Sequence, residues 1–163
     1  MRWDLPRTLE VFVDTNRADR YGDPTGMDGW NEIVDAYRSN RHKGSERELA
    51  NVGWVASHVG DAMDEQGWPE MRSKEDAVPC VVDLLFVERN RRRDIGNIHG
   101  GAKYVLDALT RRHRLGCGAI YDDSQRWLKD VTYAVAIDPE SPGIRITVRE
   151  LEPRRHELGE VLI

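Results

Sequence analysis

The chain contains little cysteine and no long apolar run, and each shortage excludes a class of protein. Only two cysteines occur, Cys80 and Cys117, without a CxxC pair, so we expect no zinc site built on thiolates and a reduced, cytoplasmic protein. Apolar stretches such as residues 84–87 are far shorter than the roughly 18 residues that a membrane-spanning helix needs. Residues 1–6 lack the apolar segment of a secretory signal. We therefore expect no membrane partner.

The composition is that of one folded domain. The 163 residues fit a single domain spanning 1–163, because domains typically contain about 100–200 residues. The charged fraction is high at 33%, but several tryptophans and the Val, Ile and Leu runs argue against disorder.

The net charge of −5 disfavours a nucleic-acid partner only when it is averaged over the chain. Residues 88–114 carry eight basic and three acidic side chains, a local charge of +5, which leaves −10 for the rest. A basic segment on an acidic body indicates a partner with phosphate groups.

The first half of the chain predicts a strand, a loop and two helices. Residues 8–13 alternate as a strand does, and residues 16–29 have loop composition. A short helix is expected around residues 30–37, and residues 38–44 read as a polar break. The next helix is expected to begin at Ser45, which has Glu48 at capping-box spacing, and to end at Gly67.

The second half predicts a buried strand, a helix and a hairpin. Residues 80–87 are nearly all apolar, which is typical of a strand buried on most of both faces, and residues 98–109 carry a helical apolar stripe. Residues 131–137 and 144–148 alternate around a turn at 138–143, which predicts a β-hairpin. The order of elements predicts an α+β fold, a small mixed β-sheet with helices packed mainly on one face.

Acidic residues stand at the junctions on both sides of the second-half helix. Asp94 precedes the helix, and Asp122 and Asp123 follow it. Short carboxylates are the ligands that Mg²⁺ or Mn²⁺ prefers, and such an ion can activate water against a phosphodiester. The alternative for each single residue is a helix cap or a solvated turn.

Lys103 and His99 each have more than one reading. Lys103 and Asp107 are four residues apart on the helix, which fits a surface ion pair or an ammonium placed to stabilise a developing oxyanion. His99 fits a surface residue, a metal ligand or a group that orients water.

The basic run next to Asp94 is typical of phosphate binding. Its arginines are Arg89, Arg91, Arg92 and Arg93. Guanidinium groups contact phosphate oxygens with two hydrogen bonds, and such contacts dominate nucleic-acid affinity. Basic residues that draw a phosphate backbone toward metal-binding acids are the expected arrangement of a nuclease.

Several short motifs in order resemble the RusA-type Holliday junction resolvases, endodeoxyribonucleases of bacteria and phages. The residues that match are Arg92-Arg93-Asp94-Ile95-Gly96-Asn97, Lys103, Asp107-Ala108-Leu109 and Asp122-Asp123-Ser124-Gln125. The best-matching core is residues 79–151, and residues 14–78 are a loop and helical elaboration. The chain departs from the family at Gly96, where the usual motif has a second Asp, and in a later Lys, as in a divergent branch of the family.

The resemblance implies a RusA-like fold and a homodimer that cuts the two strands of a four-way DNA junction with Mg²⁺ or Mn²⁺. It implies catalytic roles for Asp94, Lys103 and Asp123, and metal ligands chosen from Asp94, Asp107, Asp122 and Asp123. It also implies DNA contacts from Arg89, Arg91, Arg92, Arg93 and Asn97, and a bacterial protein or a phage-encoded one.

Two alternatives stay open. The loss of a ligand at Gly96 fits a non-catalytic protein that binds branched DNA through a degenerate metal site. A weaker alternative is a metal-dependent phosphoesterase that acts on a small nucleotide.

Overall fold

A mixed four-stranded sheet forms the centre of the protein. The computed structural model describes residues 6–15, 17–18, 24–25 and 27–154. The strand order is β1 (Thr8–Asp14), β6 (Gly143–Glu150), β4 (Cys80–Glu88) and β5 (Leu128–Ile137). Only the β4–β5 pair is parallel. The short strands β2 (Arg17–Ala18) and β3 (Pro24–Thr25) pair with each other, and the rest of the predicted loop at 16–29 lies partly outside the described residues.

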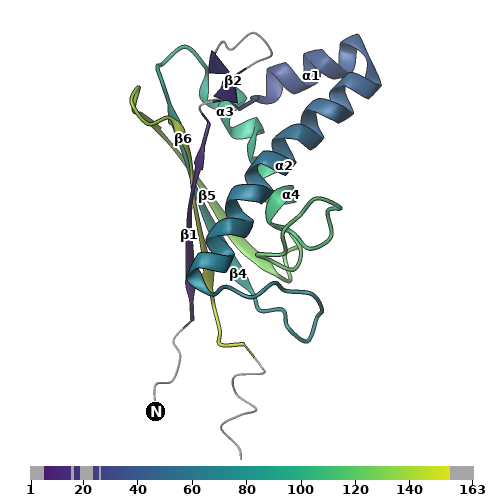
Figure 1. The fold of residues 1–163 in the computed structure, drawn as a ribbon, viewed down its shortest axis with the longest axis vertical. Helices are drawn as coiled ribbons and strands as arrows, with labels where there is room; N and C mark the ends of the chain where they lie inside the picture. Colours follow the sequence, from purple (N-terminus) through teal and green to yellow (C-terminus); the bar gives the residue numbers. More distant parts are fainter. Residues whose placement is uncertain (1–5, 16, 19–23, 26, 155–163) are drawn as a thin grey trace, which may run out of the picture.

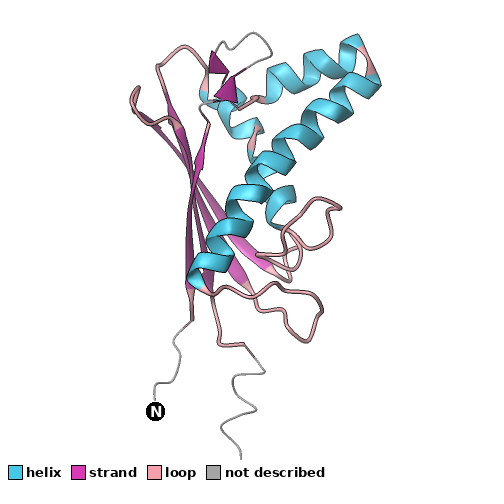
Figure 2. Ribbon diagram, viewed as in Figure 1, coloured by secondary structure: helices cyan, strands magenta, loops and turns pink. Residues whose placement is uncertain are grey.

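The helices cover one face of this sheet, as Figures 1 and 2 show. They are α1 (Trp30–Ser39), α2 (Arg41–Gln66), α3 (Ile95–Gly100) and α4 (Ala102–Leu109). The predicted stripe on α2 is buried at Val52, Ala56, Val59 and Met63, against alternate residues of the sheet. The predicted α+β class, with helices packed on one face, is therefore confirmed. No helix among the described residues is long and apolar enough to cross a membrane.

The predicted C-terminal hairpin is wrong. Both strands exist, but β4 lies between them, parallel to β5 and antiparallel to β6. Residues 138–142 pass across the end of β4, where the Asp138 N–H donates to the Glu88 carbonyl oxygen at 2.9 Å. Alternation and a turn predict two strands but not their partners, because a five-residue connection can step over one intervening strand.

Two other boundaries differ from the sequence predictions. Strand β4 is not buried on both faces, because Val81, Asp83 and Leu85 on the face without helices are half-exposed. The helix predicted for 98–109 begins earlier and is divided into α3 and α4 at Gly101. A Cβ atom at Gly101 would lie 2.8 Å from the Tyr104 hydroxyl, so the glycine allows the close approach at this break.

Helix α2 begins at Arg41, four residues before the predicted start, so the polar break at 38–44 is mostly helix. Its N-cap is Asn40, whose side-chain oxygen accepts a hydrogen bond from the His42 N–H at 2.8 Å. Glu48 does not form the expected capping box and instead accepts from the Tyr37 hydroxyl at 2.6 Å. Asn40, and not Ser45, therefore caps the N-terminus of α2.

The substitution Asn40→Ala is expected to lower the free energy of unfolding by about 1 kcal/mol, since it removes the N-cap acceptor of α2. The matched change Ser45→Ala lies inside the helix and should change stability by less than about 0.5 kcal/mol. Urea denaturation of both variants measures the difference. A larger loss at Ser45 than at Asn40 would contradict the observed start of α2.

Candidate functional site

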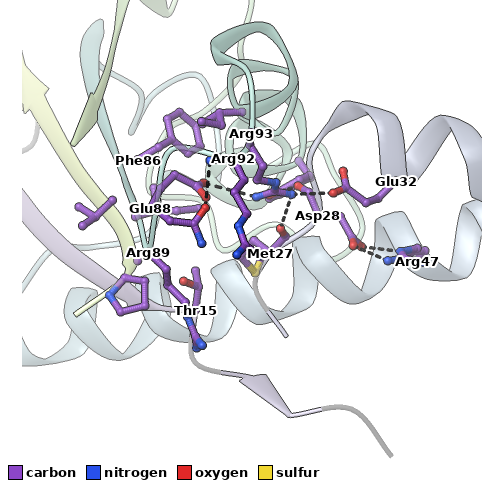
Figure 3. A pocket seen from close by; sticks show the side chains of 17 residues that line it. Thr15, Met27, Asp28, Glu32, Arg47, Phe86, Glu88, Arg89, Arg92 and Arg93 are labelled. Carbon is purple, nitrogen blue, oxygen red and sulfur yellow. Dashed lines mark hydrogen bonds and ion pairs between the residues drawn. The ribbon is translucent and has the colours of Figure 1, made fainter. Parts of the chain in front are cut away.

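The basic loop after β4 borders a pocket of about 400 Å³, which we name the arginine pocket. Figure 3 shows Arg89, Arg92 and Arg93 lining it together with acidic side chains that include Glu32 and Glu88. Arg91 and Arg92 are exposed, as phosphate contacts require, and Arg89 is half-buried. The predicted basic run therefore divides into outward-facing arginines and arginines that enter the protein surface.

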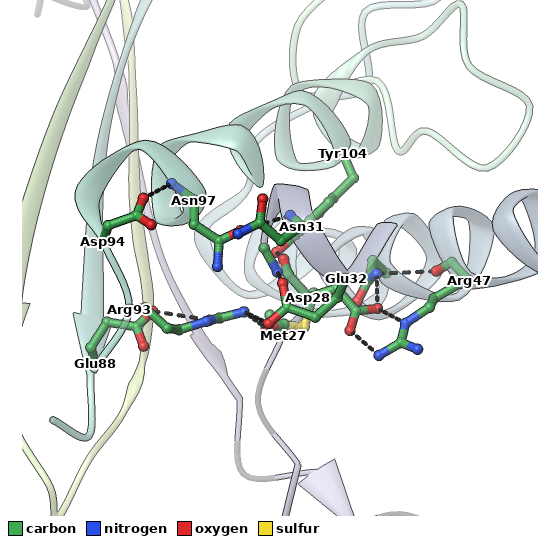
Figure 4. A network of polar contacts seen from close by, with 12 residues as sticks. Met27, Asp28, Asn31, Glu32, Arg47, Glu88, Arg93, Asp94, Asn97 and Tyr104 are labelled. Atoms are coloured by element: carbon green, nitrogen blue, oxygen red, sulfur yellow. Dashed lines mark hydrogen bonds and ion pairs between the residues drawn. The ribbon is translucent and has the colours of Figure 1, made fainter. Parts of the chain in front are cut away.

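Arg93 is a structural link between elements that are distant in the sequence (Figure 4). Its guanidinium contacts Glu32 at 3.1 Å and Glu88 at 3.4 Å and donates to the Met27 carbonyl oxygen at 2.9 Å. Burial alone would raise the pKa of the Glu32 carboxyl, but backbone N–H groups and Arg93 together hold that pKa below its usual value. The Arg93 guanidinium thus forms ion pairs with two carboxylates. These contacts favour a role for Arg93 in fixing the basic loop over a role in binding DNA.

Asn97 has a similar internal role. It is buried, and its side-chain oxygen accepts a hydrogen bond from the Asn31 N–H at 2.7 Å, at the beginning of α1. Gly29 lies against it, since a Cβ atom at position 29 would come within 2.7 Å of that same oxygen. The side chain predicted to contact DNA therefore joins α3 to α1.

Asp94 is the N-cap of α3. Its Oδ1 accepts a hydrogen bond from the Asn97 N–H at 2.7 Å, the helix-cap reading that the sequence left open. A Cβ atom at Gly96 would lie 3.5 Å from this oxygen, an ordinary contact distance. The position at which the resembled family carries its second Asp therefore adjoins the Asp94 carboxylate, and a side chain fits there.

A second pocket, of about 350 Å³, brings together residues that the sequence separates by more than 30 positions. We name it the Lys103–Asp123 pocket, and His99 and Tyr133 also line it. Lys103 is held at 3.1 Å by Asp107, as the i, i+4 spacing predicted. The carboxylate of Asp123 is exposed and makes no hydrogen bond or ion pair with any other side chain or backbone group in the described part of the chain. An ammonium group and a free carboxylate therefore share one open hollow.

His99 also lines this pocket and packs against two aromatic rings. Its ring is 5.2 Å from the Tyr133 ring and 6.2 Å from the Phe86 ring, measured between centroids. Its Nε2 is buried and has no hydrogen-bond partner within the described part of the chain. Sequence reasoning did not select Tyr133, because an aromatic residue in an alternating strand gives no signal for a site.

The carboxylate of Asp122, unlike that of Asp123, has bonding partners within the protein. It is buried, one oxygen accepts from the Asp123 N–H at 2.9 Å, and the other contacts Arg112 at 3.3 Å. This bonding fits a residue that positions the Asp123 loop better than a direct metal ligand.

The predicted acidic residues do not form one cluster. Within residues 6–15, 17–18, 24–25 and 27–154, no three His, Cys, Asp or Glu side chains lie close enough together to hold a metal ion. Mg²⁺ is commonly held by one or two carboxylates, with waters and substrate phosphate completing its shell. The free carboxylate of Asp123 fits that smaller donor set, whereas Asp94, the other predicted ligand, lines neither the arginine pocket nor the Lys103–Asp123 pocket.

The two cysteines are unsuited to act as nucleophiles. Burial raises the pKa of the Cys80 thiol to about 12 and that of the Cys117 thiol to about 11. Both thiols are therefore protonated at neutral pH, where the thiolate is the reactive form.

A scan of protein-family models and a search of curated proteins each find no match to this chain. The motifs in the sequence and the geometry of the two pockets are therefore the observations that bear on function.

Proposed function

We propose that this protein is a metal-dependent endodeoxyribonuclease that cuts branched DNA in the manner of the RusA-type resolvases. The observation that carries the proposal is the Lys103–Asp123 pocket, which Lys103, Asp123 and His99 line together. Segments on both sides of α4 contribute to this pocket, and the motifs that resemble the family lie in the same segments. Mg²⁺ or Mn²⁺ held by Asp123 together with water and substrate phosphate would neutralise phosphate charge and activate water.

The chain's own groups have distinct tasks in this proposal. The exposed Arg91 and Arg92 bind the DNA backbone through phosphate oxygens. Lys103, oriented by Asp107, donates to a phosphate oxygen as negative charge develops there. Arg93 and Asn97 hold the basic loop and α3 in place against α1.

The symmetry of a four-way junction extends the proposal to a homodimer. Paired incisions require two sites related by a two-fold axis, which a symmetric dimer supplies. By the same resemblance, we propose that the protein acts in the cytoplasm of a bacterium and is encoded by the host or by a phage.

A junction cleavage assay with a series of divalent ions tests the proposal. Purified protein is expected to cut a synthetic four-way junction in Mg²⁺ or Mn²⁺ and to lose all cutting in EDTA. Linear duplex DNA of the same sequence is the control substrate and should be cut much more slowly. Junction cleavage that persists in EDTA would contradict the metal requirement.

Among the described residues there is no cluster of three metal-binding side chains. This favours a second candidate function, that of a protein that binds branched DNA without cutting it. This candidate predicts junction binding that weakens steeply with salt and no cleavage in any divalent ion. The double variant Arg91→Ala, Arg92→Ala should weaken binding in both cases. Only cleavage distinguishes the two functions.

A further inference from the structure

The two edges of the sheet differ in whether side chains cover their outer backbone groups. At the β1 edge, the Gln66 side chain of α2 accepts from the Glu10 N–H at 3.1 Å and donates to the Glu10 carbonyl oxygen at 2.7 Å. The indole of Trp54 donates to the Asp14 carbonyl oxygen at 2.8 Å. Side chains of α2 thus occupy backbone groups of β1 that would otherwise attract another strand.

The β5 edge has no comparable cover from the part of the chain that the structure describes. Among the described residues, β5 pairs only with β4. The segment 131–137 contains no charge, proline or glycine, and Tyr133 and Ile137 are exposed to 44% and 41%. Natural edge strands usually carry charges, prolines or bulges that prevent pairing, and this stretch carries none of them.

Backbone alternation determines which residues of β5 face outward. The Asp138 N–H points to β4, where it donates to the Glu88 carbonyl oxygen. Successive residues of a strand direct their backbone groups to opposite sides, so those of Tyr133, Val135 and Ile137 face the free edge. The Val131 N–H shares that side and is bonded to the adjacent Asp130 carboxylate at 2.9 Å.

We propose that β5 pairs antiparallel with β5 of a second copy of this chain, around a two-fold axis at Tyr133. The inference rests on the homodimer of the proposed function and assigns its surface. In this register Tyr133 faces its own counterpart and Val131 faces Val135, so apolar side chains meet across the axis. A register centred on Ala134 would instead oppose the carboxylates of Asp130 and Asp138.

A second copy fits this edge better than an unrelated strand does. A two-fold axis perpendicular to the sheet joins the two β5 strands into one eight-stranded sheet and removes both free edges. It keeps both helix layers on the same side. An uncharged strand offers no charge pattern that would select a different partner.

The dimer would join the two candidate sites. Tyr133 belongs both to the pairing edge and to the Lys103–Asp123 pocket. The strand of the second copy would therefore run beside each pocket, and both pockets would open on the same side of the sheet. Two symmetric incisions in one junction need that arrangement.

Complementary charges at position 133 test the pairing and its register by sedimentation equilibrium without DNA. Wild-type protein is expected to be a dimer. Tyr133→Lys and Tyr133→Glu should each weaken dimerisation by at least about 100-fold, since like charges face each other about 5.5 Å apart between Cα atoms. An equimolar mixture of the two variants should form a heterodimer. Phe12→Lys, at a residue 41% exposed on the covered β1 edge, should remain a dimer.

Thermal denaturation of each variant shows whether a variant that is monomeric is still folded. A monomeric wild-type protein, or a Tyr133→Lys variant that stays dimeric, would overturn the proposal. A mixture of the two charge variants that stays monomeric would overturn the axis at Tyr133. A dimer that does not cut junctions retains the β5 pairing and rejects the nuclease, whereas a monomer that cuts them does the reverse.

Discussion

The variant Asp123→Asn is expected to cleave four-way junctions at least about 100-fold more slowly than the wild-type protein in Mg²⁺, a loss of about 2.7 kcal/mol in transition-state stabilisation. The amide keeps the size of the side chain but removes the negative charge that would hold the cation. Asp123 is exposed and its carboxylate makes no other contact within the described residues, so the fold should not change. Binding to the junction in Ca²⁺ should stay within about twofold of wild type, because the arginines supply most of the affinity.

Two further variants make this result specific. Asp61→Asn, at an exposed position on α2, is the matched control and should cleave at the wild-type rate. Asp107→Asn removes the contact that holds Lys103 and should lower cleavage less than Asp123→Asn does. Wild-type cleavage by Asp123→Asn would remove this residue from the site and leave the DNA-binding alternative as the better function.

Replacement of Arg154 by alanine is expected to lower the free energy of unfolding by about 3–5 kcal/mol. Arg154 is fully buried, and its Nε contacts Glu150 at 2.6 Å while its Nη1 donates to the Pro69 carbonyl oxygen at 2.9 Å. Its guanidinium also lies 5.3 Å from the centre of the Trp68 ring. Alanine would leave the Glu150 carboxylate buried, and among the described residues only Arg7, at 3.6 Å, would remain as its ion-pair partner.

Thermal unfolding measures this effect, with an expected decrease in Tm of roughly 10 °C for a domain of this size. Arg149→Ala is the control, because its ion pair with Asp83 is partly exposed and contributes at most about 1 kcal/mol. The double variant Arg154→Met, Glu150→Gln should be more stable than Arg154→Ala, since it leaves no unpaired charge. Equal losses for Arg149→Ala and Arg154→Ala would show that burial of the Arg154 pair contributes nothing.

Local patterns predicted the elements of this fold but not their neighbours. The alternation at residues 8–13 and the stripe on α2 were read correctly, because each depends only on which side of an element faces the core. The hairpin was wrong because strand partners are chosen by contacts between distant segments. Strand β4, which begins 48 residues before β5, lies between the two C-terminal strands.

The candidate site shows the same division. The i, i+4 spacing gave the contact between Lys103 and Asp107, and position beside a helix start was compatible with the cap at Asp94. Residue spacing could not show that Arg93 forms ion pairs with two carboxylates of the arginine pocket. The sequence also placed four aspartates in one ligand set, whereas only Asp123 lines the pocket of Lys103.

The sequence by itself determined the α+β class, most of the helices and strands, and the basic segment beside acidic junctions, because these follow from periodicity and charge along the chain. Only the tertiary structure decided the strand order, the internal roles of Arg93 and Asn97, and the pocket that Lys103 and Asp123 share. It also decided that, within the described residues, the outer edge of β5 is unpaired. The physical reason is that hydrogen bonds and ion pairs between distant segments depend on how the elements pack. Residue spacing along the chain does not record that packing.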